Sequence, residues 1–116
     1  MYGSTLLELA TMISIARLGD NAYGVTIRED IESYCAQPVP LASVYAALDR
    51  LTRRRWLTVA ASRALPVQGG RAKRLYRISA TGRSLLEHEQ LEWMRLFAAL
   101  PREFRPPQPR RLPPLH

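Results

Sequence analysis

The first part of the chain carries apolar residues at the spacing of an α-helix, which predicts a helix over residues 4–18. The apolar positions are Leu6, Leu9, Ala10, Ile13 and Ala16, and Leu7, Met12 and Ile15 widen the apolar surface. A surface this wide indicates a helix that is buried on two sides. The turn-forming residues 19–21 end it.

Two further helices are predicted over residues 23–35 and 41–54. In the first of them Ile27, Ile31 and Tyr34 share one face, and the prolines at 38 and 40 prevent its continuation. In the second, an inner stripe is formed by Val44, Leu48 and Leu51, with Tyr45 beside it. The opposite face, small at its start and cationic at its end, presents Ser43, Ala46, Ala47, Arg50, Arg53 and Arg54. A face this slim fits a DNA major groove, which is about 12 Å wide.

A β-hairpin is predicted next, with strands over residues 56–62 and 73–79. Leu57, Val59 and Ala61 alternate in the first strand, and Tyr76 and Ile78 share a face of the second. The connection 63–72 contains two glycines and is too long for a two-residue turn. Its glycines and the basic residues beside them suit a tip that reaches along phosphates, although an ordinary exposed loop has the same composition.

A last helix is predicted over residues 80–100, with Ser79 as its N-cap. Much of its surface is apolar. Five residues follow a 4-3-4-3 spacing, and with the adjacent Met94 they are the candidate dimer contacts: Leu86, Gln90, Trp93, Met94, Phe97 and Leu100. The compact part of the chain is too small to cover the distal end of this helix. We therefore expect pairing with the same helix of a second chain, with docking on its own domain as the alternative.

The length of 116 residues allows one domain and a tail. We expect a DNA-binding domain over residues 1–79, a dimerisation helix over 80–100 and a disordered or extended tail over 101–116. The tail holds six of the nine prolines and four arginines, so it either adds a weak attraction to phosphates or is inert. The fold class is mainly α with a small β-hairpin.

Positive charge is concentrated in the middle of the chain. Between Arg50 and Arg77 there are nine positive side chains and no negative one, whereas the first 36 residues hold five acidic and two basic side chains. A block of one sign in a foldable segment indicates that a polyanion binds there. Because the block spans a helix and a following hairpin, it favours a nucleic-acid-binding surface over a generic basic protein.

Other classes of function find little support in the sequence. The only histidines are His88 and His116, no cysteine–histidine cluster has metal spacing, and we expect no enzyme, metal or cofactor. No apolar run reaches the roughly 18 residues of a membrane span, so we expect a cytoplasmic protein. The single cysteine, Cys35, fits a reducing compartment, and a buried packing thiol is favoured over a redox switch.

Three helices followed by a basic hairpin is the order of a winged helix-turn-helix. Specific motifs in the same order resemble bacterial regulators of the PadR family over residues 5 to about 98. The stretch 22–28, AYGVTIR, is similar to the AYGYEIR-type start of the second helix, and 39–57, VPLASVYAALDRLTRRRWL, to the recognition-helix segment with Tyr45, Leu48 and Leu51 as hallmarks. The stretch 69–79, GGRAKRLYRIS, resembles the wing, and 80–83, ATGR, the TPEG start of the C-terminal helix.

Two positions depart from the family pattern. Arg55 stands where relatives usually have a glycine after the third helix, and a left-handed conformation there costs a side-chain-bearing residue about 1 kcal/mol. Ala80 and Thr81 replace proline and glutamate at the start of the last helix, which therefore lacks a pre-set first turn. Neither change removes a DNA-binding residue.

The resemblance implies a homodimeric transcription factor, usually a repressor, that binds palindromic double-stranded DNA. In short relatives a single C-terminal helix is the dimer arm, and some relatives bind planar aromatic compounds between the arms through a tryptophan. Trp93 lies at a comparable place, so it is a candidate contact for a small aromatic effector, although dimer packing is favoured for it.

On this reading the third helices of a dimer enter two major grooves. Ser43 and Ala46 then approach base edges, Arg50 forks onto a guanine or a phosphate, and Tyr45 directs its hydroxyl to a phosphate. Arg53 and Arg54 add to the cationic end, and the wing residues Arg71, Lys73 and Arg74 position the duplex without reading sequence. The alternative is a winged-helix module for RNA or protein contact. Trp56 and Tyr76 are expected in the core, which leaves no aromatic platform for RNA bases.

Overall fold

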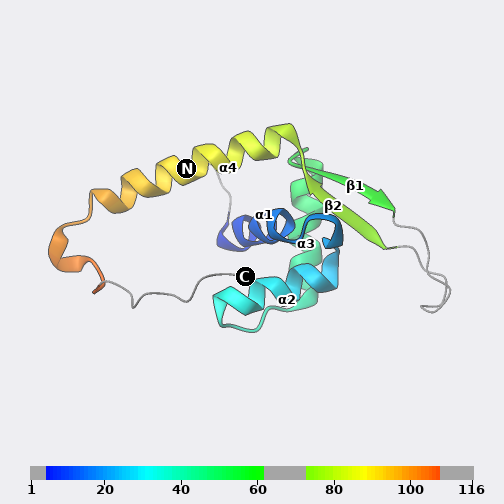
Figure 1. The fold of residues 1–116 in the computed structure, drawn as a ribbon, viewed down its shortest axis with the longest axis horizontal. Coiled ribbons are helices and arrows are strands. Elements are labelled where there is room, and N and C mark those ends of the chain that lie inside the picture. The colour runs from blue at the N-terminus through cyan, green and yellow to red at the C-terminus, as the bar shows by residue number, and fades with distance from the viewer. Residues whose placement is uncertain (1–4, 62–72, 108–116) are drawn as a thin grey trace.

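Three helices pack around an apolar core, and a two-stranded hairpin and a long fourth helix extend from it (Figure 1). The computed structural model describes residues 5–61 and 73–107. Its elements are α1 (Leu6–Leu18), the 3-10 turn η1 (Gly19–Asn21), α2 (Gly24–Cys35), α3 (Leu41–Arg53), β1 (Leu57–Ala61), β2 (Arg74–Ile78), α4 (Ala80–Ala98) and the 3-10 turn η3 (Arg102–Phe104). The predicted order of helices and strands is therefore confirmed.

α1 begins with reciprocal hydrogen bonds between Thr5 and Glu8. The backbone N–H of Glu8 donates to Thr5 Oγ1 at 3.1 Å, and that of Thr5 donates to Glu8 Oε1 at 2.9 Å. The helix is buried over much of its surface, as expected, but not at every apolar position. Leu6 is 78% exposed and Ile13 is 45% exposed, because both lie on the side of α1 that no other described element fully covers.

α2 places Ile27 and Ile31 in the core, as predicted. Tyr34 is only partly covered, but its hydroxyl donates to the carbonyl oxygen of Ala10 at 2.8 Å and so ties α2 to α1. The expectation of a buried Cys35 is wrong: the thiol is exposed. Cys35 is the last residue of α2, and the chain turns there through Ala36 in a left-handed conformation, away from the core.

The face that α3 turns to the core is wider than predicted. It includes Ala47, which is fully buried together with Val44, Leu48 and Leu51, so the prediction of an exposed Ala47 is wrong. An alanine fits here because its small side chain allows neighbouring helices to approach closely. The outer face of α3 is correspondingly rotated toward Tyr45, which is 48% exposed although it was expected beside the core.

The hairpin is antiparallel and pairs Leu57 with Ile78 and Val59 with Tyr76. One residue of each strand is buried: Leu57 of β1 and Tyr76 in the middle of β2 belong to the core, whereas Val59, which pairs with Tyr76, and Ala61 are exposed. The predicted alternation of the first strand therefore does not correspond to a buried face. The reason is that the hairpin projects beyond the helices that would cover it (Figure 1).

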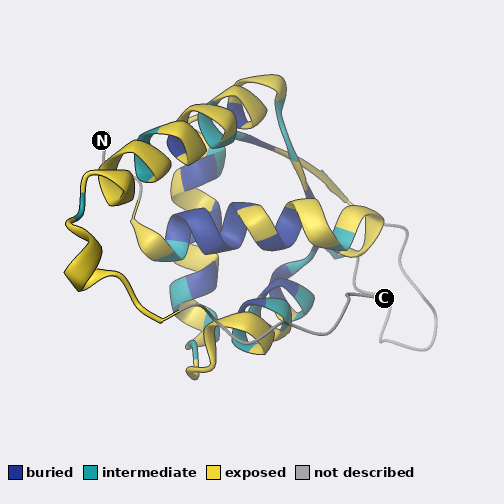
Figure 2. Cartoon of the chain, turned by 60° about the vertical axis from the view of Figure 1, so that its left-hand side comes forward, coloured by how far each residue is buried: buried dark blue, intermediate teal, exposed yellow. Residues whose placement is uncertain are grey.

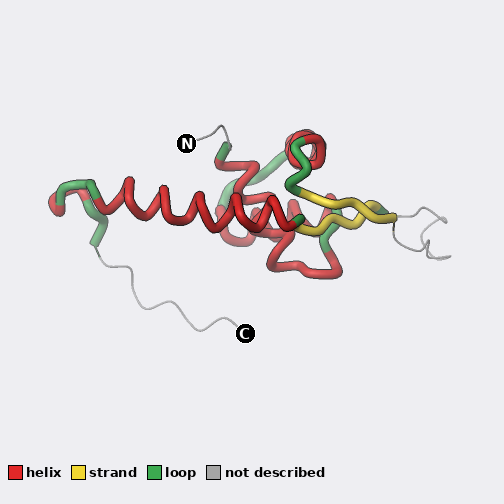
Figure 3. The backbone as a smooth tube through the Cα atoms, turned by 90° about the horizontal axis from the view of Figure 1, so that it is seen from above, coloured by secondary structure: helices red, strands yellow, loops and turns green. Residues whose placement is uncertain are grey.

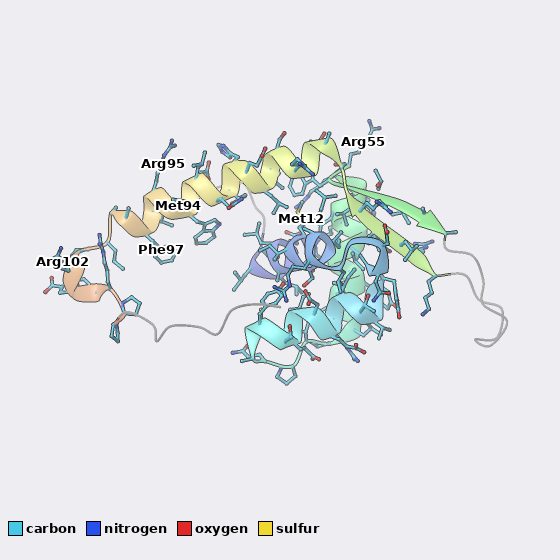
Figure 4. The ribbon with its side chains drawn as sticks, viewed as in Figure 1. Met12, Arg55, Met94, Arg95, Phe97 and Arg102 are labelled. Atoms are coloured by element: carbon cyan, nitrogen blue, oxygen red, sulfur yellow. The ribbon has the colours of Figure 1, made fainter. Side chains whose placement is uncertain are left out.

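Arg55 turns the chain from α3 into the hairpin in the left-handed conformation that its place in the sequence suggests, with φ 63°. The side chain of Ser79 supports this turn by donating to the carbonyl oxygen of Arg55 at 2.8 Å. Ser79 also caps α4, as predicted, because its Oγ accepts from the backbone N–H of Gly82 at 3.0 Å. The exit from α3, the end of β2 and the start of α4 thus form one joint (Figure 4).

α4 and the hairpin extend from the helical core in opposite directions (Figures 1 and 3). Leu85 and Leu86 at the start of α4 pack against the core, but farther along Met94 is 67% and Phe97 is 59% exposed. Figure 2 shows that most of α4 is exposed in the single chain. The helix ends at Ala98, and η3 follows where an extended or disordered chain was expected.

Candidate nucleic-acid interface

The outer side of α3 and the hairpin enclose a shallow groove. Its lining residues are Tyr45, Ala46, Asp49 and Thr52 of α3, Val59 of β1, and Arg74 and Tyr76 of β2. Two predicted DNA contacts of the recognition helix, Tyr45 and Ala46, thus lie in one concave surface with the wing residue Arg74. Ser43 is only partly exposed.

Tyr45 is held by the start of α2. A Cβ added to Gly24 would lie 2.4 Å from Cε1 of Tyr45, so the absence of a side chain at Gly24 makes room for the tyrosine ring. This contact gives a physical reason for the glycine of the AYG stretch. It also explains why Tyr45 packs beside α2 and still keeps part of its surface exposed.

The wing contributes cations at the loop end of β2. Lys73 Nζ lies 4.0 Å from the ring centroid of Tyr23, a cation–π contact that places the ammonium group beside the groove. Arg74 is exposed, whereas Arg77 pairs with Asp20 of η1. Arg77 lines a different hollow with residues of α1 and α4. Arg71, the third predicted wing residue, lies outside the described residues.

A buried carboxylate holds two arginines of α3. Glu8 is 1% exposed, and its Oε2 accepts from Arg50 Nε at 3.0 Å and from Arg54 Nη1 at 3.3 Å. Burial alone would raise the pKa of Glu8, but the backbone hydrogen bond from Thr5 and the two guanidinium groups together lower it below the ordinary value. Arg54 is also held from its other side, since its guanidinium carbon lies 5.2 Å from the ring centroid of Trp56.

The remaining arginine of α3 has a different partner. Arg53 Nη2 lies 2.7 Å from Asp49 Oδ2, one helical turn earlier, and both side chains are well exposed, at 76% and 58%. The four arginines from 50 to 55 are therefore not equivalent. Arg50 and Arg54 are drawn toward α1, Arg53 stays on the outer face beside the groove residue Asp49, and Arg55 forms the turn.

Sequence reasoning missed the two carboxylates. The i, i+4 spacing of Asp49 and Arg53 was a visible signal for their ion pair. No comparable signal existed for Glu8, because 42 residues separate it from Arg50 and only the packing of α1 against α3 brings them together.

A second candidate surface lies between α1 and α4. A hollow there is lined mainly by the apolar residues Leu9, Ile13, Ala16, Leu86, Trp93 and Met94, with Arg17, Glu89 and Gln90 around them. Trp93 stacks on Phe97 with ring centroids 5.9 Å apart, and its indole Nε1 is buried without a hydrogen-bond partner among the described residues. Figure 4 shows Phe97 on the side of α4 nearer to α1 and Arg95 pointing away.

The family model of the PadR-like transcriptional regulators matches residues 12–88. A transcriptional regulator of Thermoplasma acidophilum has a similar structure, with a TM-score of 0.62 and 22% identity over 80% of this chain and 89% of that chain. A PadR family regulator of Clostridium difficile gives a TM-score of 0.61 and 22% identity, over 78% of this chain and 91% of that one.

A third similar structure is Bordetella bronchiseptica BpsR, whose DNA binding is regulated by 6-hydroxynicotinic acid. Its TM-score is 0.56 and its identity 18%, over 85% of this chain and 69% of that chain. A search of curated proteins gave no match. Within the described part of the chain, no helix has the length and apolar character needed to cross a membrane. The structural likenesses confirm the winged-helix fold.

Proposed function

The chain belongs to the PadR-like family of transcriptional regulators, and from this premise we propose how it binds DNA. Membership makes it a DNA-binding regulator and confirms the expectation that it is not an enzyme. We propose that it is a repressor that binds palindromic operator DNA as a homodimer. α3 enters the major groove, and the basic wing contacts the backbone.

The observation that carries this proposal is the groove between α3 and the hairpin. Tyr45, Ala46, Asp49 and Thr52 of α3 line one wall, and Val59 of β1 with Arg74 and Tyr76 of β2 line the other. We assign DNA contacts to Ser43, Tyr45, Ala46, Arg50, Arg53, Arg54, Arg71, Lys73 and Arg74. The domain that carries them, residues 1–79, is the DNA-binding unit.

The exposed apolar side of α4 supports the homodimer. Large apolar groups at Met94 and Phe97 face solvent in the single chain, and Leu6 and Ile13 of α1 are exposed as well. A second copy would cover such a surface, since contiguous apolar patches on one chain usually mark contacts. We assign the dimer contacts to Leu86, Gln90, Trp93, Met94, Phe97 and Leu100, within an arm spanning residues 80–100 and followed by a tail over 101–116.

Light scattering after size exclusion tests the dimer. The full chain is expected to have the mass of a dimer, and Phe97→Asp is expected to shift it to a monomer, because a charge would be buried in the interface. Arg95→Asp is the matched control, since Arg95 points away from this side (Figure 4). A monomeric wild-type chain would contradict the symmetric operator.

Titration of the full chain with duplex DNA and with hairpin RNA of equal charge tests the class of partner. The proposal expects tight binding to a subset of duplex sequences. Equal binding to the RNA would instead favour the alternative winged-helix module for RNA or protein contact.

We further propose that the hollow beside Trp93 binds a small aromatic effector. Its apolar lining supports this, as do the structural similarity to BpsR and Trp93 Nε1, which has no hydrogen-bond partner among the described residues. Fluorescence of Trp93 in a Trp56→Phe variant, titrated with 6-hydroxynicotinic acid, is expected to be quenched. Unchanged fluorescence and unchanged DNA affinity would exclude this compound as the effector.

A further inference from the structure

An arginine of α3 could either read a base or contact a backbone phosphate, and the surroundings of each arginine distinguish between these two roles. An arginine that reads a base must project from the outer face of the helix and be able to extend its fork of N–H donors to a guanine edge. Arg50 meets this requirement less well than Arg53, because its Nε is bound to the buried Glu8 of α1 and its side chain is 44% exposed, against 76% for Arg53. Arg54 is likewise held between Glu8 and the ring of Trp56.

The burial of Ala47 fixes which face of α3 points outward. With Val44, Ala47, Leu48 and Leu51 in the core, the outer face contains Ala46, Asp49 and Arg53, which are spaced i, i+3 and i+7 and are all exposed. Asp49 lines the groove shared with the wing, and Arg53 is joined to it by a 2.7 Å ion pair. The pair therefore lies on the outer face of α3, in its C-terminal half and next to the groove that α3 forms with the hairpin.

We propose that Asp49 and Arg53 form the base-reading pair of α3, and that Arg50 and Arg54 contact backbone phosphates. The proposal rests on the DNA-binding role proposed above. The Arg53 guanidinium donates to O6 and N7 of a guanine, and the Asp49 carboxylate accepts from the exocyclic amino group of a cytosine. Asp49 holds the Arg53 fork in place before DNA arrives.

The negative charge of Asp49 adds a second source of selectivity. It directly precedes the block from Arg50 to Arg77, which contains no acidic residue, and it lies on the face that meets a polyanion. Opposite a base edge without a donor, the carboxylate would have no partner on the DNA and would lie near the phosphates. DNA sequences that place no donor opposite Asp49 are therefore bound more weakly, so an unfavourable contact contributes to specificity.

The distinguishing experiment uses the full chain and the duplex that wild type selects from a random pool. Affinities for this duplex and for its single-base variants are measured for wild type, Arg53→Gln, Asp49→Asn and Arg50→Gln. The proposal expects Arg53→Gln to lose discrimination at one base pair, on the order of 5- to 150-fold. Asp49→Asn is expected to bind unrelated duplexes more tightly and to lose discrimination at a cytosine.

Arg50→Gln is the matched control on the same helix. It is expected to weaken binding to all duplexes by a similar factor, as the loss of a phosphate contact does. The assignment is overturned if Arg53→Gln weakens all sequences equally, or if Arg50→Gln is the variant that changes the preferred base. If wild type itself selects no duplex sequence, the proposed function fails as well, and the two failures are thereby distinguished.

Discussion

At the scale of single residues, Arg55 is the clearest case of backbone strain. Its φ of 63° lies in the left-handed region, where a Cβ approaches the following carbonyl oxygen. The turn is nevertheless maintained, because Trp56 donates its backbone N–H to the carbonyl oxygen of Leu51 and Ser79 binds the carbonyl oxygen of Arg55. Contacts around the joint therefore impose a conformation that the residue itself disfavours.

Replacement of Arg55 by glycine should relieve this strain. We expect Arg55→Gly to raise the free energy of unfolding by roughly 0.5–1 kcal/mol relative to Arg55→Ala, since part of the gain is offset by the flexibility of glycine in the unfolded chain. Arg55→Ala is the control because it removes the same charge and keeps the Cβ. Urea unfolding of the two variants gives the comparison, and equal stabilities would show that the turn is unstrained.

Glu8 is the residue whose charge ties α1 to α3. Because its pKa is lowered in the folded chain, it contributes stability at a pH above its ordinary value of 4.5, and that contribution is lost as the pH falls through the folded pKa. Glu8→Gln should lower the free energy of unfolding at pH 7 by roughly 1–2 kcal/mol, a value reduced by the partial exposure of both guanidinium groups.

The pH dependence separates this effect from packing. The difference in stability between wild type and Glu8→Gln should shrink as the pH falls from 4.5 through the lowered pKa of folded Glu8, because the carboxyl group then becomes neutral first in the unfolded and then in the folded chain. Urea unfolding at fixed protein concentration, at pH 7 and near pH 3, measures it. A difference that stays constant with pH would mean that the glutamine packs poorly and that charge is unimportant.

At the scale of elements, the wing carries one cation beside the groove and another that is held in an ion pair away from it. Lys73 rests on Tyr23 beside the groove, whereas Arg77, four residues along the same strand region, pairs with Asp20 on another side. The hairpin itself is anchored by a backbone hydrogen bond of 2.9 Å from Tyr76 N–H to the carbonyl oxygen of Ala22. Contacts with the bundle therefore position the hairpin at Tyr76, in the middle of β2, and at Lys73, next to its loop end.

The salt dependence of DNA binding should distinguish these two cations. We expect Lys73→Gln to flatten the slope of log affinity against log salt by about one unit, since one fewer phosphate is neutralised. Arg77→Gln should leave the slope nearly unchanged because its guanidinium faces Asp20. Equal slopes for wild type and Lys73→Gln would show that Lys73 does not contact a DNA phosphate.

Element boundaries followed the sequence closely where local chemistry determines them. Ser79 caps α4, and the prolines before α3 keep its start at Leu41, as predicted. Burial was less predictable, because Leu6, Ile13 and Val59 are apolar and yet exposed. Periodicity identifies an apolar face but does not show whether another element is present to cover it.

At the scale of the whole molecule, α4 leaves the domain as an arm, and α3 lies at the end of the molecule where the arm begins (Figures 1 and 3). If two arms pair, a two-fold axis relates the two copies of α3. The operator should then contain two half-sites whose centres are about 10–10.5 base pairs, or a multiple of that, apart. This spacing is a consequence of geometry and does not depend on which bases are read.

Insertion of five base pairs between the half-sites tests this arrangement. The insertion turns one half-site to the opposite side of the duplex, so affinity should fall toward that of a single half-site. Fluorescence anisotropy with both duplexes and with an isolated half-site measures the loss. Unchanged affinity after the insertion would mean that the two DNA-binding domains of the dimer bind independently of each other.

The sequence alone was sufficient for the winged-helix architecture and the family, because helical periodicity and turn residues are local properties of the chain. The tertiary structure was needed for the partners of the charges. Packing of α1 against α3 brings Glu8 to Arg50 and Arg54, and the burial of Ala47 turns Asp49 and Arg53 outward. These contacts depend on how the helices rotate about their axes to fill one core, and that rotation is a property of the packed helices together.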